Sequence, residues 1–293
     1  MKKIFLFLIL VFVLNFNFSV LANDIPQGLL DSINTAFNDK NYNKVVQVAN
    51  KIIKIDSTNS YVYKLRAIAN QELCSESNCN YKAIVDDYSK AIKYDDRTSS
   101  INSSYLYHGR ARARLKLKEY EDAVADYTTA INLNDFNSFE WGTLLFFERA
   151  EARIEIEDYN GAIFDYTRAI KLIKKNNNFL KMVFYIKRGY AYLKINEYKK
   201  AIKDATKAIK IEENNSPAYF LRGKAKVLSI PSKAKTTYDI LDYISVCESA
   251  SQDLNIAKEY SLMENDMEYY KEILETQKVV NEAIEELRNI LNN

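Results

Sequence analysis

The sequence predicts an all-α protein built as a solenoid of stacked helix pairs. Only 6 glycines and 3 prolines occur in 293 residues, against about 20 and about 15 in a chain of average composition. A chain with so few helix breakers favours long helices. Tyrosine and alanine recur at a fixed spacing of 39 residues, which indicates repeated units. Hydrophobic residues make up 47% and charged residues 27% of the chain, as in a folded protein.

The N-terminus, residues 1–22, has the pattern of a secretory signal peptide. A basic start precedes the apolar run Ile4–Leu14, and small residues lead to Ala22. The alternative is an uncleaved membrane anchor. A spanning helix needs about 20 apolar residues, and Asn15 and Asn17 interrupt this one. We therefore expect cleavage and an exported protein, periplasmic or secreted.

The charge balance argues against nucleic acid as the main partner. Cleavage removes two of the 41 basic residues and none of the 39 acidic ones, so the two totals become equal. Nucleic-acid binding depends on a basic surface, and adhesion to anionic lipid needs one too. We expect neither, and no membrane span in the processed chain.

The 39-residue spacing is clearest in the second helix of each repeat. Tyr120, Tyr159 and Tyr198 each begin an apolar stripe with the spacing of one helix face. Ala130, Ala169 and Ala208 lie ten residues further along. A methyl side chain at such a position lets the neighbouring helix approach closely.

An upstream helix in each repeat has an aromatic residue three positions before Arg-Gly or Arg-Ala. We expect the small residue to lie where the two helices cross. The arginine is expected to be solvated or to pack through its aliphatic stem; the alternative is that it lies along the aromatic residue. We expect Asp86 and Asp87 to lie on the helix surface. The motif occurs at Tyr63–Ala67, Tyr107–Ala111, Phe146–Ala150, Tyr185–Gly189 and Tyr219–Gly223.

These patterns resemble the tetratricopeptide repeat (TPR) family. The fifth repeat carries the family's aromatic, small and alanine positions at Tyr185, Gly189, Tyr192, Tyr198, Ala201 and Ala208. Two features depart from the family: its proline after the second helix is absent, and the second helices are 39 residues apart instead of 34. The resemblance implies a right-handed superhelical solenoid of helix-turn-helix pairs.

About six pairs and a C-terminal helix account for the processed chain. The helix at 264–293 is expected to cap the TPR array of 23–263; a coiled-coil partner helix is the alternative. The expected pairs span about 27–60, 61–100, 103–140, 143–178, 182–215 and 217–263.

Two insertions interrupt the regular repeat pattern. The first insertion, from Cys74 to Cys79, lengthens the turn between the helices of the second pair. The other, of about fifteen residues at roughly 230–246, separates the helices of the sixth pair. Insertions in repeat proteins map to loops on one face, and loops often carry function. The insert at 230–246 is either a binding loop or an ordinary drifted insertion.

The chain offers little for catalysis or metal binding. His108 is the only histidine, and no Gly-x-Ser-x-Gly or glycine-rich phosphate motif occurs. We expect no catalytic residues, no metal and no cofactor. Cys74 and Cys79 are expected to form a structural disulfide, with free thiols as the alternative. Cys247 is either a buried thiol or an intermolecular bridge.

The resemblance implies a concave groove lined by the first helix of each pair, which holds a peptide or a partner helix. A merely solvated charged face is the alternative. The implied groove residues are His108, Arg112, Lys116, Phe147, Glu151, Glu155, Ile186, Tyr190, Lys194, Phe220 and Lys224.

Together these features predict a non-catalytic scaffold outside the cytoplasm that binds a protein or peptide partner in the groove. The alternative is a self-assembling or accessory cell-envelope protein that acts through the 230–246 insert or the C-terminal helix.

Overall fold

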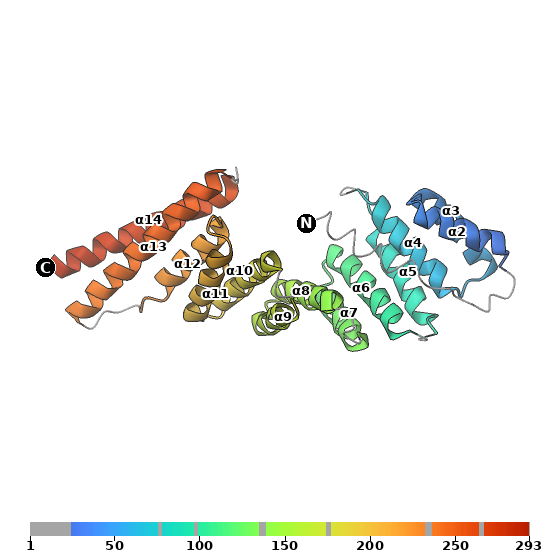
Figure 1. Cartoon of the computed structure of the whole chain (residues 1–293), viewed down its shortest axis with the longest axis horizontal. Coiled ribbons are helices and arrows are strands. Elements are labelled where there is room, and N and C mark those ends of the chain that lie inside the picture. The colour runs from blue at the N-terminus through green and yellow to red at the C-terminus, as the bar shows by residue number, and fades with distance from the viewer. Residues whose placement is uncertain are drawn as a thin grey trace. The chain divides into compact units, whose positions relative to one another are not determined.

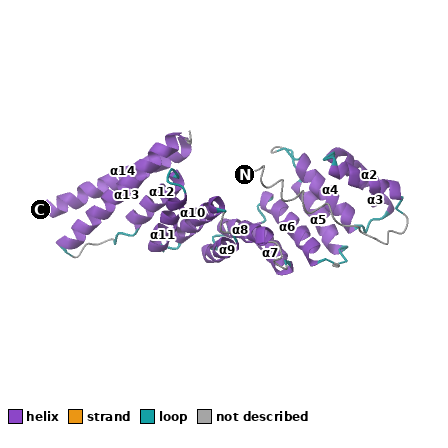
Figure 2. Cartoon of the chain, in the orientation of Figure 1, coloured by secondary structure: helices purple, strands orange, loops and turns teal. Residues whose placement is uncertain are grey.

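The computed structural model describes residues 25–75, 78–96, 99–134, 139–173, 177–231, 236–263 and 267–292. The predicted signal peptide therefore lies outside the described residues. Within them the fold is all-α, with 13 helices in sequential antiparallel pairs that form a TPR-like solenoid. Figure 2 shows these helices joined by short loops. None of the described helices is long and apolar enough to span a bilayer.

The chain divides into two compact units after Asp96. The first unit holds two helix pairs, coloured blue to cyan in Figure 1. Its helices are α2 (Gln27–Asn38), α3 (Tyr42–Ile55), α4 (Ser60–Leu73) and α5 (Tyr81–Lys93).

The second unit holds four further pairs and the C-terminal helix, which packs along α13. Its helices are α6 (Ser100–Lys116), α7 (Tyr120–Leu133), α8 (Phe139–Glu155), α9 (Tyr159–Leu172), α10 (Asn178–Lys194), α11 (Tyr198–Ile211), α12 (Ser216–Leu228), α13 (Thr237–Met263) and α14 (Met267–Asn292).

The small residue after each repeat arginine lies at a helix crossing, as the sequence predicts. A Cβ atom on Gly223 of α12 would come within 3.1 Å of the Ala250 carbonyl oxygen of α13. Ala111 and Ala150 occupy the same position in earlier pairs and are fully buried. The paired helices therefore pack closely only because this position is small.

The repeat arginines are ion-paired and lie along the aromatic residue, which was the alternative to the solvated position expected from the sequence. Arg149 of α8 donates from Nε and Nη2 to both carboxylate oxygens of Asp165 on α9, at 2.8 and 2.7 Å. Its guanidinium also lies 5.7 Å from the ring centre of Phe146. We call this arrangement the arginine clamp; the equivalent pairs are Arg66–Asp87, Arg110–Asp126, Arg188–Asp204 and Arg222–Asp253.

The clamp also reaches the preceding repeat. Arg149 Nη1 donates to Thr128 Oγ1 at 2.9 Å, and Arg188 Nη1 donates to Thr167 Oγ1 at 2.8 Å. Each threonine hydroxyl donates in turn to the carbonyl four residues earlier in its own helix. One arginine thus connects the two helices of its pair and the pair before it. Asp87 is buried in the same way, so its predicted surface position is wrong.

Four turns between paired helices place a residue other than glycine in the left-handed region. The φ angles are 57° at Lys40, 61° at Lys118, 59° at Glu157 and 61° at Asn196. At Lys118 the turn closes the end of α6: the Lys118 and Glu119 amides donate to the carbonyls of Leu115 and Arg114. This backbone conformation costs about 1–2 kcal/mol for a residue with a Cβ atom.

The insert at 230–246 is largely helical and not a loop. Helix α13 begins at Thr237, and residues 232–235 lie outside the described part of the chain. The Thr236 amide donates to Asp239, and the Asp239 amide donates to the Thr236 hydroxyl. This reciprocal pair is a capping box, and it starts the helix well before the Ala250–Ala257 repeat signature.

Breaking one arginine clamp is expected to be costly. Arg149 is 8% exposed and Asp165 is fully buried, so Arg149→Ala removes the bidentate partner of a buried carboxylate and leaves it paired only with Arg153; the fold should lose about 3 kcal/mol, the lower end of the range for a broken buried ion pair. Urea denaturation followed by circular dichroism measures the change. Arg168→Ala is the matched control on the exposed face of α9 and should cost less than about 1 kcal/mol. Equal losses for the two variants would contradict the clamp's role.

Removing the strain at a turn is expected to stabilise the fold. Lys118→Gly should raise the free energy of unfolding by about 0.5–1 kcal/mol, because glycine adopts this φ angle freely but gains entropy in the unfolded chain. Lys118→Ala is the control, because it keeps the Cβ atom and should give no gain. Thermal denaturation of both variants measures the change in stability. If Lys118→Ala stabilises the fold as much as Lys118→Gly, backbone strain at this φ angle is not the cause.

Candidate binding groove

The predicted groove residues lie at three fixed offsets from the clamp arginines: two before, two after and six after. Their exposure rises along this series. Residues four apart on an α-helix are rotated by about 40° relative to one another. A stripe with this spacing therefore turns gradually from the packed face of the helix toward solvent.

The first group packs between helices and does not line an open groove. The His108 ring lies 4.6 Å from Trp141 of α8, and Phe147 stacks on Phe184 of α10 at 4.9 Å. Ile186 and Phe220 are buried at the same offset. The expectation that these four residues face a ligand is corrected, because each meets the first helix of the following repeat or, for Phe220, helix α14.

The second group pairs with the following first helix or with α14. Arg112 lies 3.9 Å from Glu148, Glu151 accepts from Lys187 at 2.7 Å, and Lys224 donates to Glu272 at 3.0 Å. At the same offset, the Tyr190 and Tyr269 hydroxyl oxygens are 3.3 Å apart. These contacts join neighbouring repeats, and the last repeat to α14, along one face of the second unit.

The third group is exposed. Lys116, Glu155 and Lys194 make no ion pair with the described residues. They stand at or near the ends of α6, α8 and α10, where the stripe has turned outward. Among the predicted groove residues, these three have charges available to a ligand.

A cavity of about 330 Å³ brings four of the predicted residues together between α6 and α8. We call it the α6–α8 pocket. Arg112 and Lys116 come from α6, and Glu151 and Glu155 come from α8. Five further residues that the sequence does not predict also line it: Leu115, Tyr120, Tyr127, Glu148 and Ala152.

The Tyr127 hydroxyl is the unusual group in the α6–α8 pocket. Tyr127 is fully buried, and its hydroxyl makes no hydrogen bond of good geometry with the described residues. Tyr166, its equivalent 39 residues later, donates to Glu151. The residue equivalent to Glu151 in the earlier repeat is Arg112, which offers no acceptor. Tyr127 therefore lacks the glutamate that the next repeat supplies at this position, and its hydroxyl interacts with Glu148 instead.

A buried polar pair adjoins the same pocket through Glu148. His108 Nε2 and Glu148 Oε2 are 2.7 Å apart, and the two side chains are 7% and 12% exposed. Burial raises the pKa of Glu148, but His108, and then Arg112 and Tyr127, lower it by more, so the net shift is downward. Burial, and then the Glu148 charge, raise the pKa of Tyr127, which keeps its phenol protonated.

In the last two repeats α14 covers the stripe. Tyr269 of α14 packs edge-on against Phe220 at 5.2 Å and approaches the Tyr190 hydroxyl. Glu272, one turn further along, accepts from Lys224. The predicted groove residues Tyr190, Phe220 and Lys224 therefore contact the protein's own C-terminal helix.

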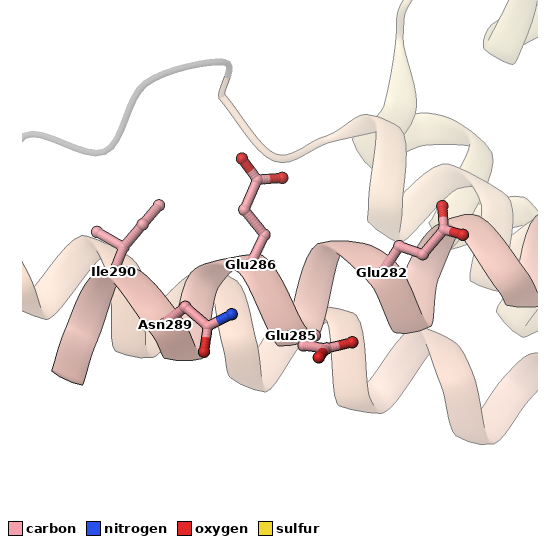
Figure 3. Close-up of a pocket in the computed structure, with 5 residues that line it drawn as sticks. All are labelled: Glu282, Glu285, Glu286, Asn289 and Ile290. Atoms are coloured by element: carbon pink, nitrogen blue, oxygen red, sulfur yellow. The ribbon is translucent and has the colours of Figure 1, made fainter. Parts of the chain in front are cut away.

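A second cavity, of about 340 Å³, lies on α14 (Figure 3). Its lining residues are Glu282, Glu285, Glu286, Asn289 and Ile290, all from successive turns of this helix. No second element contributes a described residue to it, so it is an acidic helix face and not an enclosed site.

Two cysteines close a turn, and the third lies in the core. Cys74 and Cys79 form a disulfide between α4 and α5, with their Cα atoms 4.9 Å apart. Cys247 is a free thiol buried against Phe220 and Leu254. Among the described residues, no group of three His, Cys, Asp or Glu side chains is placed to hold a metal ion.

Comparison with known proteins identifies two of the repeats directly. Models of the tetratricopeptide repeat match residues 104–137 and 183–215. The chain therefore contains tetratricopeptide repeats, and TPR domains are typically non-catalytic. No curated protein sequence matches the chain.

Several solved structures share the fold. The C-terminal part of a TPR repeat-containing protein from Cytophaga hutchinsonii aligns with a TM-score of 0.54 and 18% identity, over 87% of this chain and 93% of that one. YrrB, described as a TPR protein with an unusual peptide-binding site, gives 0.53 and 16%, over 72% and 91%. MamA gives 0.52 and 17%, over 64% and 92%. These likenesses establish the fold.

The lowered pKa of Glu148 predicts a pH-dependent contribution to stability. The ionised carboxylate stabilises the fold above the unfolded pKa of about 4.3, and this contribution is lost as the pH falls through the lower folded value. Glu148→Gln should therefore destabilise the fold by about 1–3 kcal/mol at pH 7, and its difference from the wild type should shrink below about pH 4.

Urea denaturation across this pH range measures the difference. Glu285→Gln on the exposed face of α14 is the control and should behave as the wild type throughout. A gap for Glu148→Gln that stays constant or widens in acid would show that the carboxylate is not held ionised by its partners.

Proposed function

We propose that this protein is a non-catalytic scaffold that binds a segment of a protein partner in the α6–α8 pocket. The observation that carries this proposal is the pocket itself, a cavity of about 330 Å³ with charged walls and a buried tyrosine hydroxyl that makes no hydrogen bond of good geometry. A buried polar group that is poorly satisfied costs free energy, and a ligand that accepts a well-aligned hydrogen bond from it recovers part of that cost.

The proposed site is confined to the third and fourth repeats. There the charges of Lys116 and Glu155 are exposed, whereas α14 contacts the corresponding stripe in the last repeats. The peptide-binding site described for YrrB is consistent with this use of the fold.

The proposed location is outside the cytoplasm. The leader-like pattern of residues 1–22 supports export. The disulfide between Cys74 and Cys79 also supports it, because such bonds persist mainly in oxidising compartments.

A second candidate is self-association or envelope attachment through the last two helices. Tyr238 is 84% exposed and Leu241 is 48% exposed on the part of α13 that belongs to the insert. Exposed apolar side chains on one helix favour contact with another surface. This candidate places the interaction on α13 and α14 instead of the pocket.

A pull-down from the native cell envelope tests the proposal. The bait is the full chain with a C-terminal tag, recovered from the envelope fraction. Lys116→Ala/Glu155→Ala should lose the partner, because it removes both exposed charges of the pocket. Lys210→Ala/Glu213→Ala, an exposed pair at the end of α11, is the matched control and should retain it.

Equal recovery by both double variants would contradict the pocket as the binding site. Loss of the partner only in Tyr238→Ser/Leu241→Ser would favour the second candidate. Recovery of the bait only from the cytoplasm would contradict the proposed location.

A further inference from the structure

The α6–α8 pocket has one free charge of each sign. Five charged residues line it, but three of them already have partners: Arg112 faces Glu148, and Glu151 is held by Lys187 and Tyr166. Lys116 and Glu155 are exposed and make no ion pair with the described residues. A ligand therefore meets one cation and one anion that are not already neutralised.

The two free charges stand on opposite walls at equivalent positions. Lys116 is the last residue of α6, and Glu155, 39 residues later, is the last residue of α8. The side chains of these helices touch through His108 and Glu148, and packed helices lie roughly 8–10 Å apart. In an extended peptide, residues i and i+2 point to the same face about 7 Å apart. Flexible lysine and glutamate side chains close the remaining gap.

The floor of the pocket supplies a hydrogen-bond donor. The Tyr127 hydroxyl is buried without a good partner, and its phenol stays protonated because burial disfavours the phenolate. Arg112, which replaces the acceptor found at Glu151 in the next repeat, is itself a donor. Glu148 is the acceptor near the hydroxyl, but the bond lacks good geometry, so a well-aligned acceptor such as a peptide carbonyl fits this site.

From these three features we infer that the pocket selects an extended peptide segment in which an acidic and a basic side chain stand two residues apart. The acidic side chain pairs with Lys116, the basic one pairs with Glu155, and a carbonyl of the segment accepts from Tyr127. This inference rests on the proposed function and specifies its ligand. A segment with two acidic residues places one of them against Glu155, and a segment with two basic residues places one against Lys116.

The test uses fluorescein-labelled dodecapeptides that share one neutral host sequence. Their central residues are Glu-Thr-Lys, Lys-Thr-Glu, Glu-Thr-Glu, Lys-Thr-Lys or Ser-Thr-Ser, and fluorescence anisotropy measures binding to the full-length protein. The wild type should bind one of the two mixed peptides about fivefold more tightly than the other peptides. This is the effect of one exposed charge pair at the upper end of its range.

Charge reversal should change the preference in a defined way. Glu155→Lys should prefer Glu-Thr-Glu, and Lys116→Glu should prefer Lys-Thr-Lys. Tyr127→Phe should weaken binding of every peptide about fivefold without changing their order. Lys210→Glu, at an exposed site away from the pocket, is the control and should match the wild type. Circular dichroism checks that each variant is folded.

The same peptide order in the wild type and both reversal variants would overturn this inference, as would failure of the wild type to bind any peptide. Either result leaves the proposed function standing if the pull-down still loses its partner with Lys116→Ala/Glu155→Ala. The proposed function fails separately if that double variant retains the partner.

Discussion

The buried arginine–aspartate pair is the interaction on which the register of each clamped helix pair depends. Removing two charges from water costs several kcal/mol per ion, and only good geometry repays it. Arg149 and Asp165 meet this condition with two parallel hydrogen bonds, and Phe146 lies against the guanidinium. Arg153, one turn further along α8, also donates to Asp165 at 2.8 Å, so the buried carboxylate is held by two arginines of the same helix. The bond from Arg149 to Thr128 extends the constraint to the preceding repeat.

Fixing the arginine also fixes the rotation of the first helix, and this decides which residues meet solvent. Because each step of four residues turns the stripe by about 40°, His108 is buried, Arg112 is partly covered and Lys116 is exposed on one helix. The same series runs through Phe147, Glu151 and Glu155 on the next first helix, where Phe147 is only partly buried. The arginine clamp on the opposite side of the helix thus determines which charges a ligand meets. A substitution in the clamp would alter the pocket by rotating the helix, although no clamp residue lines the pocket.

The sequence alone predicts the helix pairs well, because their signals are local. The 39-residue spacing of Tyr120, Tyr159 and Tyr198 and the small residue after each arginine both survive in the structure. The clamp was missed although its signal was present: Arg149 precedes Asp165 by 16 residues, as Arg110 precedes Asp126. This separation crosses a turn, so it has meaning only once helix lengths are known. The pocket floor was missed for the same reason, because Tyr127 comes from the second helix.

The joint that holds the α6–α8 pocket differs from the following joints at one position of otherwise equivalent repeats. At the joint between α6 and α8, the position two residues after the clamp arginine is Arg112, and the Tyr127 hydroxyl, beside Glu148, makes no hydrogen bond of good geometry. One repeat later the position is Glu151, which satisfies the tyrosine hydroxyl. A further repeat along it is Tyr190, whose bulky ring joins the cluster that includes Tyr269 and Phe220. The shared repeat architecture therefore does not itself define a binding site. The exchange of an acceptor for a donor at this position leaves a buried hydroxyl without a well-aligned partner, and this distinguishes the joint from the next one.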